Sequence, residues 1–278
     1  MKSIFDVSAP AKLNLFLHIV GRRSDGYHLL ESVFALIDWC DILHFDQRRD
    51  GQISREDLGT PLPADDLVVR AARALQQFGG VRQGALIGIH KCIPVQAGLG
   101  GGSSDAASTL LALNRLWGLD LDLSSLLSIG LKLGADVPFF LAGQNAFVTG
   151  IGETLLPVAV PLSHYLVAKP PQGLETGRIF SHPLLKRDTE PTIMSGYATD
   201  TQGVGCNDMQ SVAMKLCPGV GVALDWLKQQ GLEGQMTGSG SAVFAKLPGY
   251  FETESVPDSF QVRVCCGLSE HPLLGWAR

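Results

Sequence analysis

The sequence lacks any arrangement of cysteines that would support a disulfide framework or a structural zinc site. Its six cysteines form neither a CxxC pair nor a zinc-like Cys/His spacing; they are Cys40, Cys92, Cys206, Cys217, Cys265 and Cys266. Secreted domains that depend on disulfides carry regular cysteine patterns, so the sequence predicts a reducing compartment and no bound zinc.

The chain also has no long apolar run and no excess of positive charge. No segment approaches the roughly 20 apolar residues that span a bilayer, and no secretory apolar region precedes the Ala9-Pro10-Ala11 tripeptide. The formal net charge is -5, which gives no indication of extended contact with nucleic acid. We therefore expect a cytoplasmic protein that contacts neither membranes nor nucleic acid.

The composition is that of a globular protein with a large core. The chain has 278 residues, of which 45% are hydrophobic and 18% charged, enough for one large domain or two ordinary ones. Periodicity of 2 or 3.6 residues predicts a mixture of strands and helices. The expected strands are 5–20, 32–46, 85–90, 165–168, 241–247 and 261–265. The expected helices start at Asp65 or Asp66 and run to Phe78, and cover 106–117, 124–133, 209–216 and 222–229.

A domain boundary is predicted near the middle of the chain. Gly150-Ile151-Gly152 and the proline-spaced run 157–161 interrupt both helix and strand patterns. We place the domains at 1–156 and 157–278, and interpret the polar segment 186–205 as a loop.

The segment from Pro94 to Ser104 is the clearest functional signal. Four glycines among five residues lead directly into a predicted helix, so free backbone can surround a phosphate while helix N–H groups point at it. The loop consists of Pro94, Val95, Gln96, Ala97, Gly98, Leu99, Gly100, Gly101, Gly102, Ser103 and Ser104. No Gly-Lys-Ser/Thr follows, and Ser103 occupies the last glycine position of a dinucleotide fingerprint, so neither common nucleotide motif fits. The alternative is a flexible linker capped by Ser103 or Ser104; their hydroxyls could equally contact phosphate and Mg²⁺.

Two charged residues admit both a structural and a chemical interpretation. Lys12 lies in an apolar strand, where an ammonium needs an anionic partner or a route to solvent; taken alone, a route to solvent is favoured. Asp136 precedes a short apolar turn and could either cap it or serve as a catalytic carboxylate. Transfer of phosphate to an alcohol needs a phosphate site, charge neutralisation and often a proton acceptor. The glycine loop, Lys12 and Asp136 are candidates for these three roles.

Two further elements carry weaker signals. The segment 237–241, Thr-Gly-Ser-Gly-Ser, reads as a tight turn between strands. Tyr27 and His28 pair an aromatic face with a ring nitrogen, which suits the binding of a base, although such a pair more often serves packing.

Taken together, three motifs of this chain resemble those of the GHMP kinases. They are Ala9-Lys12-Asn14, the segment 94–107 and the turn 237–240. Within this family, the segments 10–15, 25–28 and 133–138 are similar to those of members that phosphorylate a cytidine-diphosphate-linked sugar alcohol for isoprenoid synthesis.

The resemblance implies a two-domain α/β (α+β) fold, with an N-terminal domain like domain 2 of ribosomal protein S5 and a C-terminal α/β sandwich. It implies ATP, with Mg²⁺, along residues 94–104, and a small-molecule substrate in a cleft between the domains. Lys12 and Asp136 would be catalytic. Substrate would be contacted by Asn14, Tyr27, His28, Thr176 and Phe180. The segment 175–178 lacks the proline expected beside the threonine, and no acidic Mg²⁺ ligand is evident, so phosphates and water would hold the metal.

Overall fold

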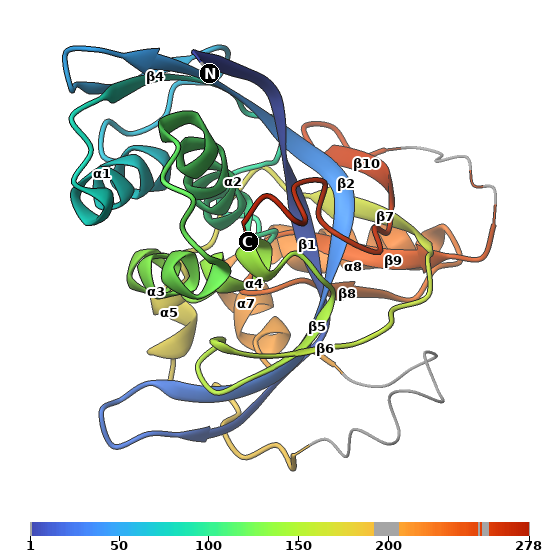
Figure 1. Cartoon of the computed structure of the whole chain (residues 1–278). Helices are drawn as coiled ribbons and strands as arrows, with labels where there is room; N and C mark the ends of the chain where they lie inside the picture. The colour runs from blue at the N-terminus through green and yellow to red at the C-terminus, as the bar shows by residue number, and fades with distance from the viewer. Residues whose placement is uncertain (1, 192–205, 250, 252–255, 278) are drawn as a thin grey trace.

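A computed structural model describes residues 2–191, 206–249, 251 and 256–277 and contains two β-sheets with helices packed against them (Figure 1). The first sheet has six strands and is built around β2. It comprises β1 (Ser3–Arg22), β2 (His28–Arg48), β3 (Ile53–Asp57), β4 (Gly84–His90), β5 (Ala146–Thr149) and β6 (Thr154–Pro157). β2 pairs antiparallel with β1, β4 and β5, β6 pairs antiparallel with β5, and β3 pairs parallel with β4.

The second sheet has four antiparallel strands in the order β10-β7-β9-β8. These are β7 (His164–Lys169), β8 (Gly234–Met236), β9 (Val243–Leu247) and β10 (Gln261–Cys266). Its core contains residues of α7 (Gln210–Leu216) and α8 (Pro218–Gln229), and also Leu17 and Ile19 from β1. The long strand β1 therefore contributes to both halves of the molecule.

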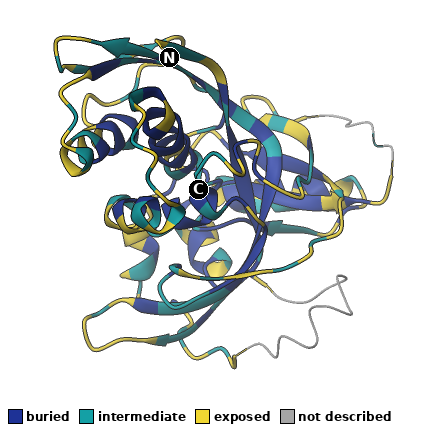
Figure 2. Ribbon diagram, viewed as in Figure 1, coloured by how far each residue is buried: buried dark blue, intermediate teal, exposed yellow. Residues whose placement is uncertain are grey.

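Four helices cover one side of the first sheet (Figure 1). They are α1 (Leu67–Gly79), α2 (Gly101–Trp117), α3 (Leu123–Leu133) and α4 (Val137–Ala142). Their inner faces are buried against the sheet, as Figure 2 shows. α1 begins where Asp66 accepts a hydrogen bond from the Val69 amide at 3.0 Å and ends at Gly80, whose φ of 61° suits glycine.

The two sheets meet through a third apolar cluster. It joins Leu13 of β1 and Leu99 of the glycine loop to Tyr165 and Phe244 of the second sheet. After β10 the chain returns to the first sheet, where Leu273 enters the core beside the helices. The chain leaves the first sheet at Pro157, where β6 ends, and enters the second sheet at His164, where β7 begins. The domain boundary after residue 156 stays a prediction.

Most predicted elements are confirmed, and three of them start well before the predicted residue. β2 begins at His28 and not at Ser32. α2 begins at Gly101 and not at Ala106, because Gly100 takes a left-handed φ of 73° at the N-cap. α8 begins at Pro218 rather than Val222; proline is favoured in the first turn. β3, β5, β6, β8 and the short helices α4 and α5 (Thr176–Phe180) were not predicted, since none is long enough to show a clear period. Residues 192–205 of the predicted loop 186–205 lie outside the described residues.

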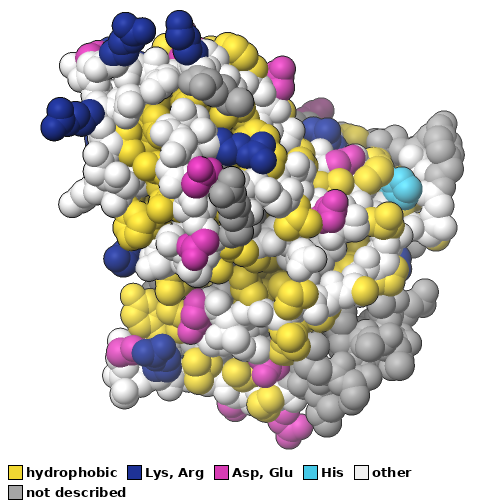
Figure 3. Space-filling view, viewed as in Figure 1, with side chains coloured by type: hydrophobic (Ala, Val, Ile, Leu, Met, Phe, Trp, Pro, Cys, Tyr) yellow, Lys and Arg dark blue, Asp and Glu magenta, His cyan; other side chains and the backbone are white. Residues whose placement is uncertain are grey.

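All six cysteines are unpaired in this structure. Among the described residues, no helix combines the length and the apolar character that crossing a bilayer requires. Lys and Arg side chains on the face in Figure 3 are interspersed with acidic, apolar and other side chains.

Candidate active site

A cavity of about 730 Å³ brings the predicted site residues together. Its walls come from β1, the glycine loop and α2, the residues before α4, and the segment around α5. Lys12, Asn14, Asp136, Thr176 and Phe180 line it, as do residues 94–103 of the loop. Most of the residues that the sequence singled out thus face one space.

The glycine loop ends in a helix whose first turn has no acidic residue. Gly100, the N-cap of α2, supplies no side-chain hydrogen bond, and the helix opens with Gly101, Gly102 and Ser103. The first N–H groups of a helix have no partner within it, and the helix dipole favours an anion there. The alternative interpretation of the loop, a linker capped by Ser103 or Ser104, is excluded, because both serines lie inside the first turn of the helix.

The turn at 237–241 packs directly against the glycine loop. A Cβ added to Gly98, whose φ is 74°, would lie 2.2 Å from the Thr237 carbonyl oxygen. The Ala242 amide donates to the Ala97 carbonyl at 3.1 Å. The turn connects β8 to β9, as its simplest interpretation predicted, and it also packs against the glycine loop.

Lys12 is buried, so the prediction that it reaches solvent is wrong. Its residue is only 3% exposed, and its Nζ donates a hydrogen bond to Asn14 Oδ1. The Asn14 Nδ2 donates to Ser32 Oγ at 2.8 Å, which fixes the amide so that its oxygen faces Lys12. The ammonium also lies 4.7 Å from the centroid of the Phe34 ring. These contacts hold the charge at one place in the cavity wall.

Asp136 occupies the N-cap position of α4 but makes no side-chain capping hydrogen bond. Its Oδ2 lies 3.7 Å from Lys12 Nζ, and its side chain is 33% exposed. Of the two interpretations left open by the sequence, the cap is therefore excluded. The carboxylate faces the ammonium in the cavity.

Burial lowers the pKa of Lys12 below its usual value, and Asp136 partly offsets this effect. A buried ammonium is costly unless it is paired and hydrogen-bonded. Strongly perturbed lysines in cavities are characteristic of functional sites. The protonation of Lys12 therefore depends both on its burial and on the carboxylate of Asp136.

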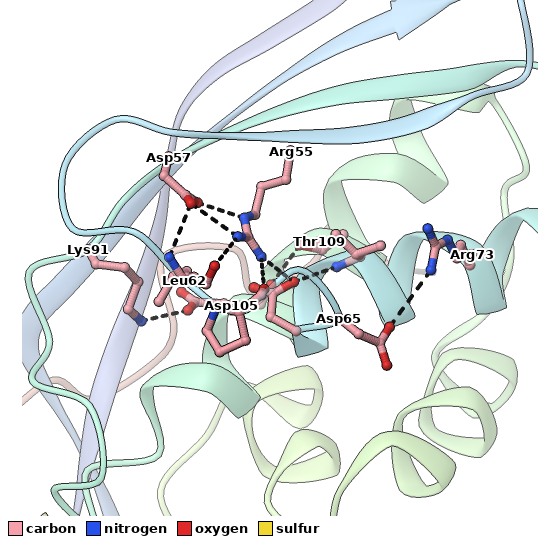
Figure 4. A network of polar contacts seen from close by, with 11 residues as sticks. Arg55, Asp57, Leu62, Asp65, Arg73, Lys91, Asp105 and Thr109 are labelled. Atoms are coloured by element: carbon pink, nitrogen blue, oxygen red, sulfur yellow. Dashed lines mark hydrogen bonds and ion pairs between the residues drawn. The ribbon is translucent and has the colours of Figure 1, made fainter.

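A second buried charge cluster, which the sequence analysis missed, lies beside the glycine loop. Lys91 contacts Asp41 and Asp105, and its Nζ is 2.6 Å from Asp105 Oδ2 (Figure 4). Burial and Asp41 raise the pKa of Asp105 to about 8, despite the opposing effect of Lys91. Lys91 and Asp105 both line the cavity. A lysine shortly before the loop, paired with an aspartate in the following helix, was the available signal.

The wall between β3 and α1 is fixed by Arg55 (Figure 4). Its guanidinium lies 2.7 Å from Asp57 and 2.8 Å from Asp66, and donates to the Leu62 carbonyl at 3.0 Å. Leu62, Asp66 and Leu67 line the cavity. This network holds an apolar wall near the glycine loop, and no sequence motif marks it.

At the opposite side, α5 brings Thr176 and Phe180 to the cavity. The Thr176 hydroxyl is 2.7 Å from that of Ser239 in the 237–241 turn. Phe180 stacks on His28, with ring centroids 4.8 Å apart and an interplanar angle of 20°. His28 is buried and not among the lining residues, while Tyr27 is 60% exposed and lies outside the cavity wall. Of the two predicted residues, His28 thus contacts a lining residue, Phe180, and neither His28 nor Tyr27 lines the cavity itself.

This arrangement is that of a GHMP kinase. The GHMP kinases N terminal domain model matches residues 66–144, and the GHMP kinases C terminal model matches 197–258. Kinases of this family use ATP as phosphate donor.

The chain belongs to the GHMP kinase family, and individual relatives narrow the comparison. It is 66% identical to a 4-diphosphocytidyl-2-C-methyl-D-erythritol kinase of Albidiferax ferrireducens, across all of this chain and 96% of the relative. A crystal structure of 4-(cytidine 5'-diphospho)-2C-methyl-D-erythritol kinase matches with a TM-score of 0.76 at 30% identity, over 95% of this chain and 99% of that one. A homoserine kinase from Cytophaga hutchinsonii shares the fold, with a TM-score of 0.70 at 16% identity over 98% and 96% of the two chains.

Proposed function

We propose that the protein transfers the γ-phosphoryl group of ATP to the 2-hydroxyl of 4-diphosphocytidyl-2-C-methyl-D-erythritol. The products are the 2-phosphate and ADP, in isoprenoid precursor synthesis by the methylerythritol phosphate pathway. The observation that carries the proposal is the Lys12–Asp136 pair facing the same cavity as the glycine loop. The full-length similarity to kinases of this name selects the substrate.

In this proposal the ATP phosphates lie along residues 94–104. The backbone N–H groups of Gly101, Gly102 and Ser103 offer donors, and the dipole of α2 favours the negative charge. The apolar wall at Leu62 and Leu67 would face the adenine end. Catalysis of phosphoryl transfer consists mainly of positioning ATP and the substrate hydroxyl and of stabilising the negative charge between them.

Mg²⁺ would accompany the phosphates. Among the described residues, no group of three or more His, Cys, Asp or Glu side chains could hold a metal ion, and Asp105 is already bound to Lys91. Single oxygen donors are available: Ser103 and Asp105 line the cavity, and the buried Ser104 Oγ and Asp105 Oδ1 have no hydrogen-bond partner. This donor set fits a cation held mainly by ATP oxygens and water, which would offset phosphate charge when bound.

The chemical step would use two side chains. The substrate hydroxyl gives its proton to Asp136 while its oxygen forms a bond to the γ-phosphorus, and the bond from that phosphorus to the ADP oxygen breaks. Lys12 would stabilise the negative charge that develops on the attacking oxygen, and Asn14 would keep the ammonium in place.

The cytidine end would lie toward α5. Phe180 provides an aromatic face in the cavity wall, with His28 stacked behind it. Tyr27, exposed at the neighbouring position, would cover the base, and Asn14 and Thr176 would lie near the alcohol. A cytoplasmic location, expected from the sequence, would suit a reaction that consumes ATP.

Substrate profiling tests the proposal against other GHMP kinases. Purified protein with ATP and Mg²⁺ is offered the cytidyl-diphosphate alcohol, mevalonate or homoserine, and products are followed by ³¹P NMR. We expect a new phosphomonoester only with the first substrate. Turnover of mevalonate or homoserine without it would contradict the assignment, and ATP binding without any turnover would favour a nucleotide-binding regulator.

A further inference from the structure

Asn207 is a buried asparagine whose side chain is bonded entirely to the backbone of other segments. The residue is 4% exposed, and its Nδ2 donates to the carbonyls of Met236 at 2.9 Å and Gly238 at 2.8 Å. Its Oδ1 accepts from the Met209 amide at 2.9 Å. Both amide hydrogens and the amide oxygen are therefore used, and any rotation of this side chain would leave buried backbone groups unpaired.

The backbone on either side of Asn207 is attached to β1, the strand that carries the buried ammonium. The Leu17 amide donates to the Cys206 carbonyl at 3.1 Å, and the Asp208 amide donates to the Leu17 carbonyl at 2.9 Å. The side chain of Asn207, in contrast, holds the start of the turn 237–241. Asn207 thus joins two segments that are far apart in sequence, β1 through its backbone neighbours and the turn through its amide.

Thr237 lies between the two carbonyls that Asn207 holds. It is fully buried, and its hydroxyl oxygen accepts a hydrogen bond from the Asn14 amide at 2.9 Å. The same oxygen lies 3.5 Å from Asn14 Oδ1, the atom that accepts from Lys12 Nζ. Because Asn207 fixes the peptide groups before and after Thr237, it also fixes the position of this hydroxyl. A continuous series of contacts therefore connects Asn207 to the Lys12 ammonium.

We propose that Asn207 is a positioning residue for phosphoryl transfer that acts through Thr237 and Asn14. By holding Thr237 against Asn14, it keeps the Lys12 ammonium beside Asp136 in the cavity. Asn207 does not line the cavity itself, so it acts without touching substrate. The inference rests on the proposed function, in which Lys12 stabilises charge on the attacking oxygen. A small displacement of such a group lowers the rate of the chemical step.

The protonation of Lys12 reports on this series of contacts without any turnover. It is followed by ¹H–¹³C correlation NMR of the lysine Cε groups as the pH is raised, with Lys12 assigned from the spectrum of Lys12→Met. A hydrogen bond to the charged form of a group favours that form, so a loosened Asn14 should lower the pKa of Lys12. We expect a midpoint below 10.5 in the wild type, and a still lower midpoint in Asn207→Leu and in Thr237→Val, where Asp136 is unchanged.

Turnover tests whether Asn207 and Thr237 act as one unit. Asn207→Leu and Thr237→Val should each lower kcat about tenfold, and the double variant should lose little more than either alone. Thr237→Ser keeps the hydroxyl and should restore most of the kcat that Thr237→Val loses. Asn114→Leu is the matched control, because Asn114 is also buried and exchanges two hydrogen bonds, both at 3.0 Å, with the backbone of Leu121. It should lose comparable stability but keep the wild-type Lys12 midpoint and kcat.

An unchanged or higher Lys12 midpoint in folded Asn207→Leu would overturn the inference. Losses of kcat that add up in the double variant would do the same, as would an equal midpoint shift in Asn114→Leu. If Asn207→Leu does not fold, Thr237→Val decides, and a wild-type midpoint and kcat in that variant would overturn the inference. If the midpoints shift as expected but the wild-type protein does not phosphorylate the alcohol, the proposed function fails, while the positioning of Lys12 by Asn207 stands.

Discussion

Replacement of Asp136 by Asn tests the proposed role of this carboxylate as proton acceptor without altering the size of the side chain. The amide has nearly the size of the carboxylate, and Asp136 makes no capping hydrogen bond whose loss would disturb α4. Asparagine cannot accept the hydroxyl proton, so only the chemical step should suffer. General-base catalysis contributes about 10²–10⁴-fold, and we expect kcat to fall within that range.

The same substitution removes a charge that stabilises the Lys12 ammonium. Across 3.7 Å, the Coulomb attraction is about 4 kcal/mol at an effective dielectric of about 20, and the 33% exposure of the Asp136 side chain reduces it. Burial lowers the pKa of Lys12 and Asp136 raises it, so Asp136→Asn lowers that pKa further. Loss of the ammonium at alkaline pH should therefore occur at lower pH in the variant.

The assay is kcat from about pH 6 to 11, together with the Kd of an ATP analogue. Wild-type activity should fall at alkaline pH as Lys12 loses its proton, below the ordinary lysine pKa of 10.5, and in Asp136→Asn this fall should move to lower pH. Binding of the analogue should change by less than about twofold, since the loop is unaltered. Turnover within about threefold of wild type, or a shift of the alkaline fall to higher pH, would refute the reasoning.

Three further substitutions test the glycine loop, the buried His271 and the cavity wall that Arg55 holds. Gly98→Ala should destabilise the protein by about 2–4 kcal/mol in denaturant unfolding, because its φ is positive and the new Cβ would meet the Thr237 carbonyl. His271 has a pKa lowered to about 4 by burial, so stability is complete above about pH 6.5 and falls toward pH 4, by on the order of 3 kcal/mol; thermal melts of His271→Asn should lack this loss. Arg55→Lys keeps the charge but cannot serve Asp57, Asp66 and the carbonyls together, so KM for ATP should rise about tenfold at nearly unchanged KM for the alcohol.

Each of these has a matched control. Gly118 also has a positive φ, 64°, but nothing lies within 4 Å of an added Cβ, so Gly118→Ala should cost only about 1 kcal/mol. The exposed His164→Asn should keep the acid-dependent loss of stability, and Arg48→Lys, on the surface pair with Asp50, should leave KM for ATP unchanged. Equal effects in a variant and its control would contradict the corresponding assignment.

The long elements of the fold could be predicted because their periodicity is carried by many apolar residues. α1 is bounded by Asp66 and Gly80, whose chemistry marks a helix start and end. The start of α2 was misplaced because a glycine-rich first turn has low helix propensity, and the helix there is imposed by packing. Gly101, for example, lies so close to Ile93 that an added Cβ would be 3.0 Å from its Cγ2.

Site residues that belong to sequence motifs could be predicted. The burial and the partners of those residues could not, because they depend on tertiary packing. Periodicity placed Lys12 in a strand, but only the packing of Phe34 and Asn14 shows that its ammonium stays inside. Arg55 and Lys91 gain their roles from contacts that the fold brings together, Arg55 with Asp66 of α1 and Lys91 with Asp41 of β2, and periodicity does not reveal such contacts.

The glycine loop and the Lys12–Asp136 pair are held together by direct contacts. The Lys12 amide donates to the Leu99 carbonyl at 3.0 Å, so β1 carries the loop on the same residue that carries the ammonium. An added Cβ on Gly100 would lie 3.1 Å from Lys12 Cγ and 2.9 Å from Phe140 Cζ, so the helix start abuts the stem of that lysine. The lack of a side chain at Gly100 therefore lets the start of α2 approach Lys12, and under the proposed function it would also leave helix N–H groups open to phosphate. If ATP binds along this loop as proposed, a larger residue at Gly100 would move its phosphates away from Lys12 and Asp136, and phosphoryl transfer depends steeply on that alignment.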